Sequence, residues 1–358
     1  MLRIDGGDAS GMKILFDLVH PANALVFCHT IRALKAEGAD VRVVSRDKDV
    51  LVPLLDELGI DHIPITTAGE GRMGLGLELL RRDWRLWNIV REWRPDVMVG
   101  FGGVAISHVG KLTGIPSLSF YDTEHAGPQI ALTLPFISEW HVPETWQGRI
   151  APRRTFRFRG GKQFTYLHPD HFRPDPDLAR AAGWEEGRDN FMLRTVAWKA
   201  NHDQGRSGIP LGQLRAIVEN LAARGKVHIS AEGELPDDLE PMRYRGSPAK
   251  FHHLLAHCRL YCGESITIAS EAVMVGVPVL LQIDKEYCYV TEQQDAGLIR
   301  RFAPTDDAVA AIDQAMAESL ESFQRRAVAF VATKGDLNDY ILRQVRRLAA
   351  TRQDRGAG

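Results

Sequence analysis

The sequence has little cysteine, no excess of either charge and no uninterrupted apolar run long enough to cross a bilayer. Four cysteines among 358 residues form no paired metal-ligand spacing, which excludes a disulfide scaffold and favours a reducing, cytoplasmic location. The 44 basic and 46 acidic residues leave a net charge of −2, so we expect no nucleic-acid partner. The most apolar stretches, 97–120 and 266–283, contain charged residues, glycine and proline, which argues against a membrane span.

The chain reads as an alternation of strands and helices from Met12 onward, after residues 1–11, which we expect to be a disordered leader. Short apolar runs alternate with amphipathic segments of helix length. Strands are predicted at 13–19, 40–45, 62–65, 97–100, 117–120, 190–197, 226–230, 259–262 and 278–282. Such βαβ units predict an α/β protein with parallel sheets in two Rossmann-like αβα domains that face each other across a cleft.

The alternation stops over residues 146–189, where prolines and a basic cluster interrupt the periodic pattern. We interpret this segment as the crossover between an N-terminal domain of residues 12–145 and a C-terminal domain of residues 190–335. Residues 336–358 are then a C-terminal helix and tail.

The clearest candidate site follows the strand that ends at Cys262. Gly263 allows the backbone to turn, and the next residues begin a helix whose free N–H groups would bind a diphosphate. Glu264, Ser265 and Thr267 lie at this start, and the Glu271 carboxylate would accept hydrogen bonds from a ribose. The alternative is an ordinary βαβ unit with Ser265 as N-cap and Glu271 as a solvated charge.

Two further candidates follow the first and fourth strands. His20, with Asn23 beside it, is placed to act as a general base, because imidazole titrates near neutral pH. Alternatively it caps a turn. Gly102 and Gly103 would let the backbone approach a substrate closely, although a tight strand-to-helix turn explains them equally well.

Acid/base chemistry is predicted after the fifth strand and in the second domain. Asp122 and Glu124 are carboxylates at a sheet end, suited either to proton transfer or to anchoring a loop. Arg194 and Lys199 suit a diphosphate, and His202 would orient a proton donor. No metal site is expected.

A tryptophan- and arginine-rich segment, 81–93, which includes Arg81, Arg82, Arg85 and Arg91, allows two interpretations. Trp84, Trp87 and Trp93 alternate with arginines, which is typical of a helix at a membrane surface. The same spacing fits tryptophans in the core with arginines outside, and we favour that interpretation.

Several motifs resemble known families. GESITIASEAVMVGVP is similar to the donor-binding helix of GT-B glycosyltransferases of the lipid-linked peptidoglycan type, and RPDVMVGFGG to another segment of those enzymes. FDLVHPANALVF, SRDKDVL, VAWKANHD and ISAEGELP resemble the domain-of-unknown-function family 354 across nearly the whole chain after Met12. YDTEHA partly resembles the H-x-E-A-G segment of non-hydrolysing UDP-N-acetylglucosamine 2-epimerases.

The resemblance implies the GT-B architecture and a sugar transfer from a nucleotide-diphosphate donor to a hydroxyl acceptor, in polysaccharide or envelope glycan synthesis. The C-terminal domain would hold the UDP-type donor and the N-terminal domain a glycan or lipid-linked acceptor, without metal or cofactor. A nucleotide-sugar 2-epimerase and a non-catalytic binding protein remain alternatives. The nucleotide, the sugar, the acceptor, the stereochemical outcome and the oligomeric state stay open.

Overall fold

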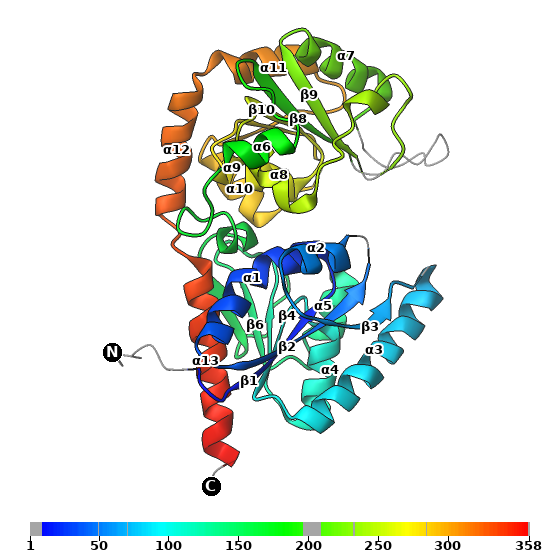
Figure 1. The fold of residues 1–358 in the computed structure, drawn as a ribbon, viewed down its shortest axis with the longest axis vertical. Coiled ribbons are helices and arrows are strands. Elements are labelled where there is room, and N and C mark those ends of the chain that lie inside the picture. Colours follow the sequence, from blue (N-terminus) through cyan, green and yellow to red (C-terminus); the bar gives the residue numbers. More distant parts are fainter. Residues whose placement is uncertain are drawn as a thin grey trace. The chain divides into compact units, whose positions relative to one another are not determined.

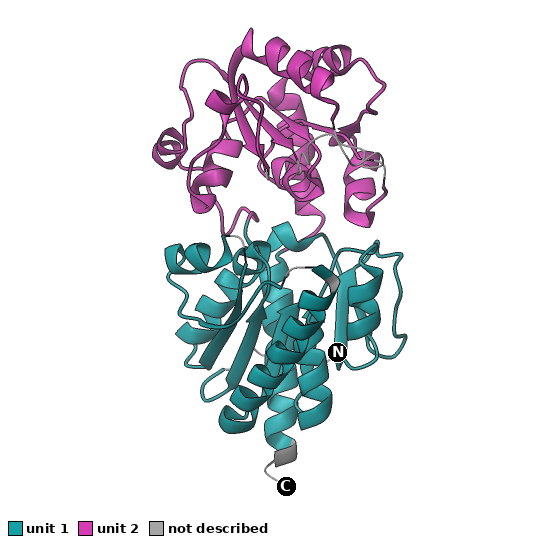
Figure 2. Cartoon of the chain, turned by 90° about the vertical axis from the view of Figure 1, so that its right-hand side faces the viewer, with its two compact units in different colours: residues 1–166, 336–358 teal, residues 167–335 magenta. Residues whose placement is uncertain are grey.

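The computed structural model describes residues 9–48, 50–69, 71–195, 209–231, 233–283 and 285–356. They form two compact units, shown in Figure 2: unit 1 comprises residues 1–166 and 336–358, and unit 2 comprises residues 167–335. None of the helices in the described ranges has the length and apolar character of a membrane span.

Unit 1 contains a seven-stranded parallel sheet in its described part (Figure 1), in the order β3-β2-β1-β4-β5-β6-β7. Its strands are β1 Lys13–Leu18, β2 Asp40–Asp47, β3 Ile63–Thr67, β4 Val97–Phe101, β5 Ser117–Phe120, β6 Glu139–Pro143 and β7 Thr155–Phe158. Its helices are α1 Pro21–Ala36, α2 Leu51–Glu57, α3 Gly71–Trp93, α4 Val104–Thr113, α5 Gly127–Thr133, the short 3-10 helix η1 Lys162–Thr165 and α13 Leu337–Gly356.

Unit 2 contains a five-stranded parallel sheet in its described part, in the order β12-β11-β10-β8-β9. Its strands are β8 Asp189–Thr195, β9 Gly225–Ala231, β10 Leu260–Gly263, β11 Val279–Leu281 and β12 Ile299–Arg301. Its helices are α6 Pro176–Ala181, α7 Leu211–Ala222, α8 Phe251–Leu255, α9 Ile266–Met274, α10 Cys288–Asp295, α11 Ala308–Ala317 and α12 Leu320–Ala332, with 3-10 turns at Glu240–Met242 and Pro248–Lys250.

The predicted strands are all present, because a parallel strand covered on both faces needs a continuous apolar run. In β1, Ile14, Leu15, Phe16 and Leu18 are fully buried. The chain adds β2 and β3 on one side of β1 and then places β4 on its other side. In open α/β sheets such a switch point, at the carboxyl ends of the strands, is where ligands bind.

The structure divides the predicted crossover differently. Residues 155–158 form β7, which pairs with β6, and η1 also belongs to unit 1, so the boundary between the units lies after Tyr166. Helix α13 packs against α1, β4 and η1 and so completes unit 1. Residues 336–358 therefore belong to unit 1.

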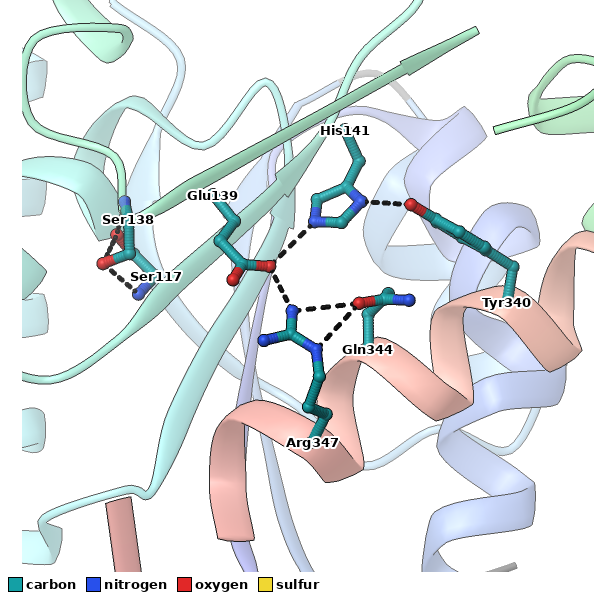
Figure 3. A network of polar contacts seen from close by, with 7 residues as sticks. All are labelled: Ser117, Ser138, Glu139, His141, Tyr340, Gln344 and Arg347. Carbon is teal, nitrogen blue, oxygen red and sulfur yellow. Dashed lines mark hydrogen bonds and ion pairs between the residues drawn. The ribbon is translucent and has the colours of Figure 1, made fainter. Parts of the chain in front are cut away.

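A polar network fixes α13 to strand β6 (Figure 3). The buried His141 contacts the Tyr340 hydroxyl through Nδ1 at 2.7 Å and the Glu139 carboxylate through Nε2 at 3.1 Å. Arg347 donates to the same carboxylate at 2.5 Å and to Gln344. Burial opposes ionisation of Glu139, but the hydrogen bonds from His141 and Arg347 outweigh it and lower the pKa of that carboxyl. The hydrogen bonds of this network compensate for the desolvation cost of burying Glu139 and His141 in β6.

The favoured interpretation of the tryptophan–arginine helix is correct for Trp93 and for the exposed Arg81, Arg85 and Arg91, but it is wrong for Trp84 and Arg82. Arg82 on α3 is buried, with only 3% of its surface exposed, and is paired with Asp17, whereas Trp84 is 62% exposed. Trp93 does pack inside. The physical reason is the ion pair: Asp17 is buried on β1 and requires a cation, which α3 supplies.

Candidate functional site

The junction between β10 and α9 in unit 2 is a tight strand-to-helix turn that starts at a glycine. A Cβ on Gly263 would lie 2.4 Å from the Arg194 carbonyl oxygen on the neighbouring strand β8, so only glycine fits. Ser265 is the N-cap of α9, and its hydroxyl accepts from the Ile268 amide at 3.4 Å. The amides of Ile266 and Thr267 have no intrahelical acceptor, as in every helix start. The first turn is half-buried, whereas the rest of α9 is buried. The helix therefore presents its N–H groups at its accessible end.

The two glutamates predicted at this junction are both buried. Glu264 accepts from the Ile209 amide, and its own amide donates to the Arg194 carbonyl at 3.1 Å, so it shapes the loop. The Glu271 carboxylate lies 3.2 Å from Nε2 of His252 and is only 4% exposed. The alternative that Glu271 is a solvated charge is wrong.

A buried glutamine that the sequence did not single out ends the adjacent strand. Gln282 directly follows β11, is 2% exposed, and its amide N–H donates to the Gly263 carbonyl at 2.9 Å. Within the described part of the chain, neither its side-chain oxygen nor its side-chain nitrogen has a hydrogen-bond partner. A buried primary amide without partners costs stability unless a ligand or water pairs with it. The sequence feature that could have indicated this residue is a glutamine at the end of the apolar run VPVLLQ, residues 277–282.

The predicted cations of unit 2 have different outcomes. Arg194 is half-buried near the end of β8, beside Gly263, and donates to the Ser230 hydroxyl at 2.7 Å. Arg194 therefore lies at the carboxyl edge of this sheet. Lys199 and His202 lie outside the described residues.

In unit 1 the first strand ends in a capped helix start. Asn23 is buried, and its Oδ1 accepts from the amides of Val19 and His20 at 3.1 and 3.0 Å. His20 is the exposed N-cap of α1, and its Nδ1 accepts from the Ala22 amide at 3.2 Å. The His20 imidazole therefore caps α1, and it lies at the carboxyl edge of the sheet.

The two glycines after β4 form a tight turn. Gly102 has a φ of 84° and Gly103 a φ of 53°, both in the left-handed region. A Cβ on Gly102 would lie 2.1 Å from the Gln129 side-chain nitrogen, so this side chain already fills the space next to Gly102. Gly103 is the N-cap of α4 and provides no side-chain cap. The close approach expected at Gly102 is thus made by Gln129.

The carboxylates after β5 have separate environments. Asp122 is fully buried, accepts from the Lys162 ammonium at 2.9 Å and from the Thr123 hydroxyl at 3.1 Å. Glu124 is half-buried in the next turn. Lys162, which lies in the basic cluster of the predicted crossover, is therefore a partner of Asp122 that the sequence did not indicate. Asp122 anchors this loop, which leaves Glu124 as the accessible carboxylate.

Across the described ranges, no three histidine, cysteine, aspartate or glutamate side chains gather as a metal-ligand set.

Comparison with known proteins supports the resemblances. Residues 12–164 match the family described as protein of unknown function (DUF354). The chain is also 37% identical over 89 residues to a UDP-N-acetylglucosamine--N-acetylmuramyl-(pentapeptide) pyrophosphoryl-undecaprenol N-acetylglucosamine transferase from Anaeromyxobacter dehalogenans. That match covers 24% of this chain and only 20% of the relative.

Solved structures match over almost the whole chain. A UDP-GlcNAc 2-epimerase from Neisseria meningitidis has a TM-score of 0.64 at 13% identity, covering 96% of this chain and 100% of that one. Spinosyn forosaminyltransferase has a TM-score of 0.62 at 17% identity, covering 95% and 100%. Identities this low show the fold alone. The predicted resemblance to the DUF354 family is thus confirmed over residues 12–164, and the chain has the fold of GT-B glycosyltransferases and epimerases, with two Rossmann-like domains.

Proposed function

We propose that the protein is a GT-B-type glycosyltransferase that moves a sugar from a nucleotide-diphosphate donor, of the UDP type, to a hydroxyl acceptor in polysaccharide or envelope glycan synthesis. The observation that carries the proposal is the β10–α9 junction. There Gly263, the capped helix start and the side-chain amide of Gln282, which has no partner among the described residues, lie at one sheet edge. The partial match to a sugar transferase supports the same reaction class.

In this proposal, unit 2 holds the donor. The diphosphate accepts hydrogen bonds from the amides of Ile266 and Thr267 and from the hydroxyls of Ser265 and Thr267, and the positive end of the α9 dipole stabilises its charge. Glu271 accepts from the ribose hydroxyls, and His252 beside it orients the carboxylate. Arg194 and Lys199 add positive charge as the nucleoside diphosphate leaves.

Unit 1 holds the acceptor. Glu124 is the proposed general base that removes the hydroxyl proton as the acceptor oxygen attacks the anomeric carbon, with His20 and His202 as the other candidates for proton transfer. The uncapped start of α4 at Gly103 provides amides for a polar acceptor group. With α9 and the cations taking the leaving-group charge, transfer needs no divalent metal, so a chelator should leave the rate unchanged.

The second candidate is a nucleotide-sugar 2-epimerase. The half-buried Glu124 in the loop after β5 favours it, because epimerisation requires a carboxylate or similar group beside a sugar carbon. A binding protein without catalysis is the third candidate.

One assay separates the three. The protein is incubated with UDP-N-acetylglucosamine, with and without a panel of sugar acceptors, and products are resolved by NMR and mass. Transfer releases UDP only when an acceptor is present, epimerisation yields an isomer of equal mass without one, and a binding protein yields neither although calorimetry detects binding.

The matched variants are Glu124→Gln and, as control, Glu219→Gln on the exposed face of α7. A general base contributes roughly 10²–10⁴-fold, so Glu124→Gln should lose that much turnover while the control keeps full activity. Full activity in a stable Glu124→Gln protein would remove this residue from the mechanism.

A further inference from the structure

Helix α3 presents an apolar stripe to solvent over its first three turns. Met73, Leu77, Leu80 and Trp84 recur at the spacing of one helix face and are 84%, 55%, 67% and 62% exposed. From Met73 to Trp84 the stripe runs for about 16 Å at 1.5 Å per residue. Large exposed apolar patches mark interaction sites.

The opposite face of the same turns is charged and buried, which prevents the helix from turning its apolar side inward. The Glu78 carboxylate accepts from Arg46 at 2.6 and 2.5 Å and from the Gly69 amide at 2.8 Å. Arg82 pairs with Asp17 of β1 and donates to the Thr66 hydroxyl at 3.0 Å. Rotation of α3 would break these buried ion pairs, which is strongly destabilising. The outward position of the stripe is therefore fixed by the fold.

A second exposed apolar pair is linked to α3 through α4. His108 of α4 bonds to Asp83 of α3 at 2.7 Å and to the Leu132 carbonyl at 3.1 Å, and its ring contacts Phe136. Leu132 and Phe136 are themselves 44% and 40% exposed. His108 therefore connects this second exposed apolar pair to α3.

The charges around the stripe have one sign. Between Met73 and Arg85, the exposed charged side chains are Arg81 and Arg85, because Glu78 is buried and Asp83 is paired with His108. An apolar stripe with a tryptophan and flanking arginines suits the interface of an anionic bilayer. A symmetric contact between two copies would instead bring these arginines close to one another, which is unfavourable.

We propose that the outer face of α3, with Met73, Leu77, Leu80 and Trp84 as the inserted residues and Arg81 and Arg85 at the headgroups, docks the protein on an anionic lipid surface. This inference does not depend on the proposed function, since its tests need no turnover.

The first test is co-flotation of the full chain with vesicles of phosphatidylcholine alone or with added anionic phosphatidylglycerol. Wild type should bind the anionic vesicles, and Leu77→Ser/Leu80→Ser should weaken binding by roughly tenfold or more, because it removes two inserted side chains. The control is Val328→Ser on α12, where Val328 is 69% exposed and so matches Leu80. Arg81→Gln should weaken binding to the anionic vesicles by about fivefold. The proposal would be overturned if Val328→Ser lost as much vesicle binding as Leu77→Ser/Leu80→Ser. It would also be overturned if wild type bound phosphatidylcholine vesicles as well as the anionic ones.

The second test locates the contact. Brominated phospholipids should quench the fluorescence of wild type, and Trp84→Phe should remove most of that quenching without loss of vesicle binding beyond a fewfold. If quenching is unchanged in Trp84→Phe, another surface touches the lipid. If sedimentation shows a dimer that Leu77→Ser/Leu80→Ser dissociates and the vesicles bind nothing, the stripe is a contact between copies and the proposal fails.

Discussion

Replacing Gln282 by methionine should stabilise the ligand-free protein and weaken nucleotide binding at the same time. The side-chain amide of Gln282 is buried without a hydrogen-bond partner in the described part of the chain, and an unpaired buried polar group costs about 1–3 kcal/mol. Methionine keeps the length and flexibility of glutamine and removes that cost. In a domain of this size each kcal/mol raises the melting temperature by about 2–4 °C. If the amide bonds to the bound nucleotide, its loss should weaken binding by about tenfold.

The assay is thermal unfolding with and without UDP, combined with calorimetric titration of UDP. Gln293 is the matched control, because it is equally buried but accepts from the Ser270 hydroxyl at 2.8 Å. Gln293→Met should lower the melting temperature, since the buried hydrogen bond from the Ser270 hydroxyl is lost. A fall in melting temperature for Gln282→Met like that of the control would show that the Gln282 amide is bonded within the protein and would refute the reasoning.

Three other predictions address ionisable groups. Burial lowers the pKa of His228 from 6.5 to about 4, so between these pH values the unfolded chain binds a proton that the folded chain does not. His228 should therefore reduce the free energy of unfolding by up to about 3 kcal/mol as the pH falls from 6.5 to 4. His228→Gln should flatten this pH dependence in denaturant unfolding, and an unchanged pH dependence would show that another group causes it. Lys162→Met removes the ammonium that pairs with the buried Asp122 carboxylate, so chemical denaturation should show a free energy of unfolding lower by about 3–5 kcal/mol. Adding Asp122→Leu should restore much of that loss, whereas an unchanged free energy of unfolding in Lys162→Met would show that the ion pair does not stabilise the fold. Glu271→Ala should weaken the binding free energy of UDP, measured by calorimetry, by about 1.5–3 kcal/mol. An unchanged affinity would show that Glu271 does not bind the ribose.

The sequence predicted those strands whose residues are apolar on both faces, and it missed strands whose polar residues are paired by distant parts of the chain. Strand β6 contains Glu139 and His141, which read as loop residues in isolation. Tyr340 and Arg347, about two hundred positions later, make their burial possible. No local pattern contains that information, so β6, β7 and the membership of α13 in unit 1 required the structure. The three-residue strand β12 was missed as well.

The same limit applies to the sites. The β10–α9 junction was predictable, because Gly263, Ser265 and the apolar helix after them follow one another in sequence. The partner of Asp122 was not, because Lys162 lies in a proline- and arginine-rich stretch that resembles a linker. Similarly, the tryptophan spacing on α3 does not reveal that Arg82 is buried, because the cause is a carboxylate on β1.

The central claim, that the start of α9 binds the diphosphate of a nucleotide sugar, is tested most directly by hydrogen–deuterium exchange of the wild-type protein with and without UDP-N-acetylglucosamine at saturating concentration. The claim predicts that peptides covering residues 263–271, which include the amides of Ile266 and Thr267, exchange more slowly with the ligand present. Unchanged exchange in these peptides, with binding established by calorimetry on the same sample, would contradict it.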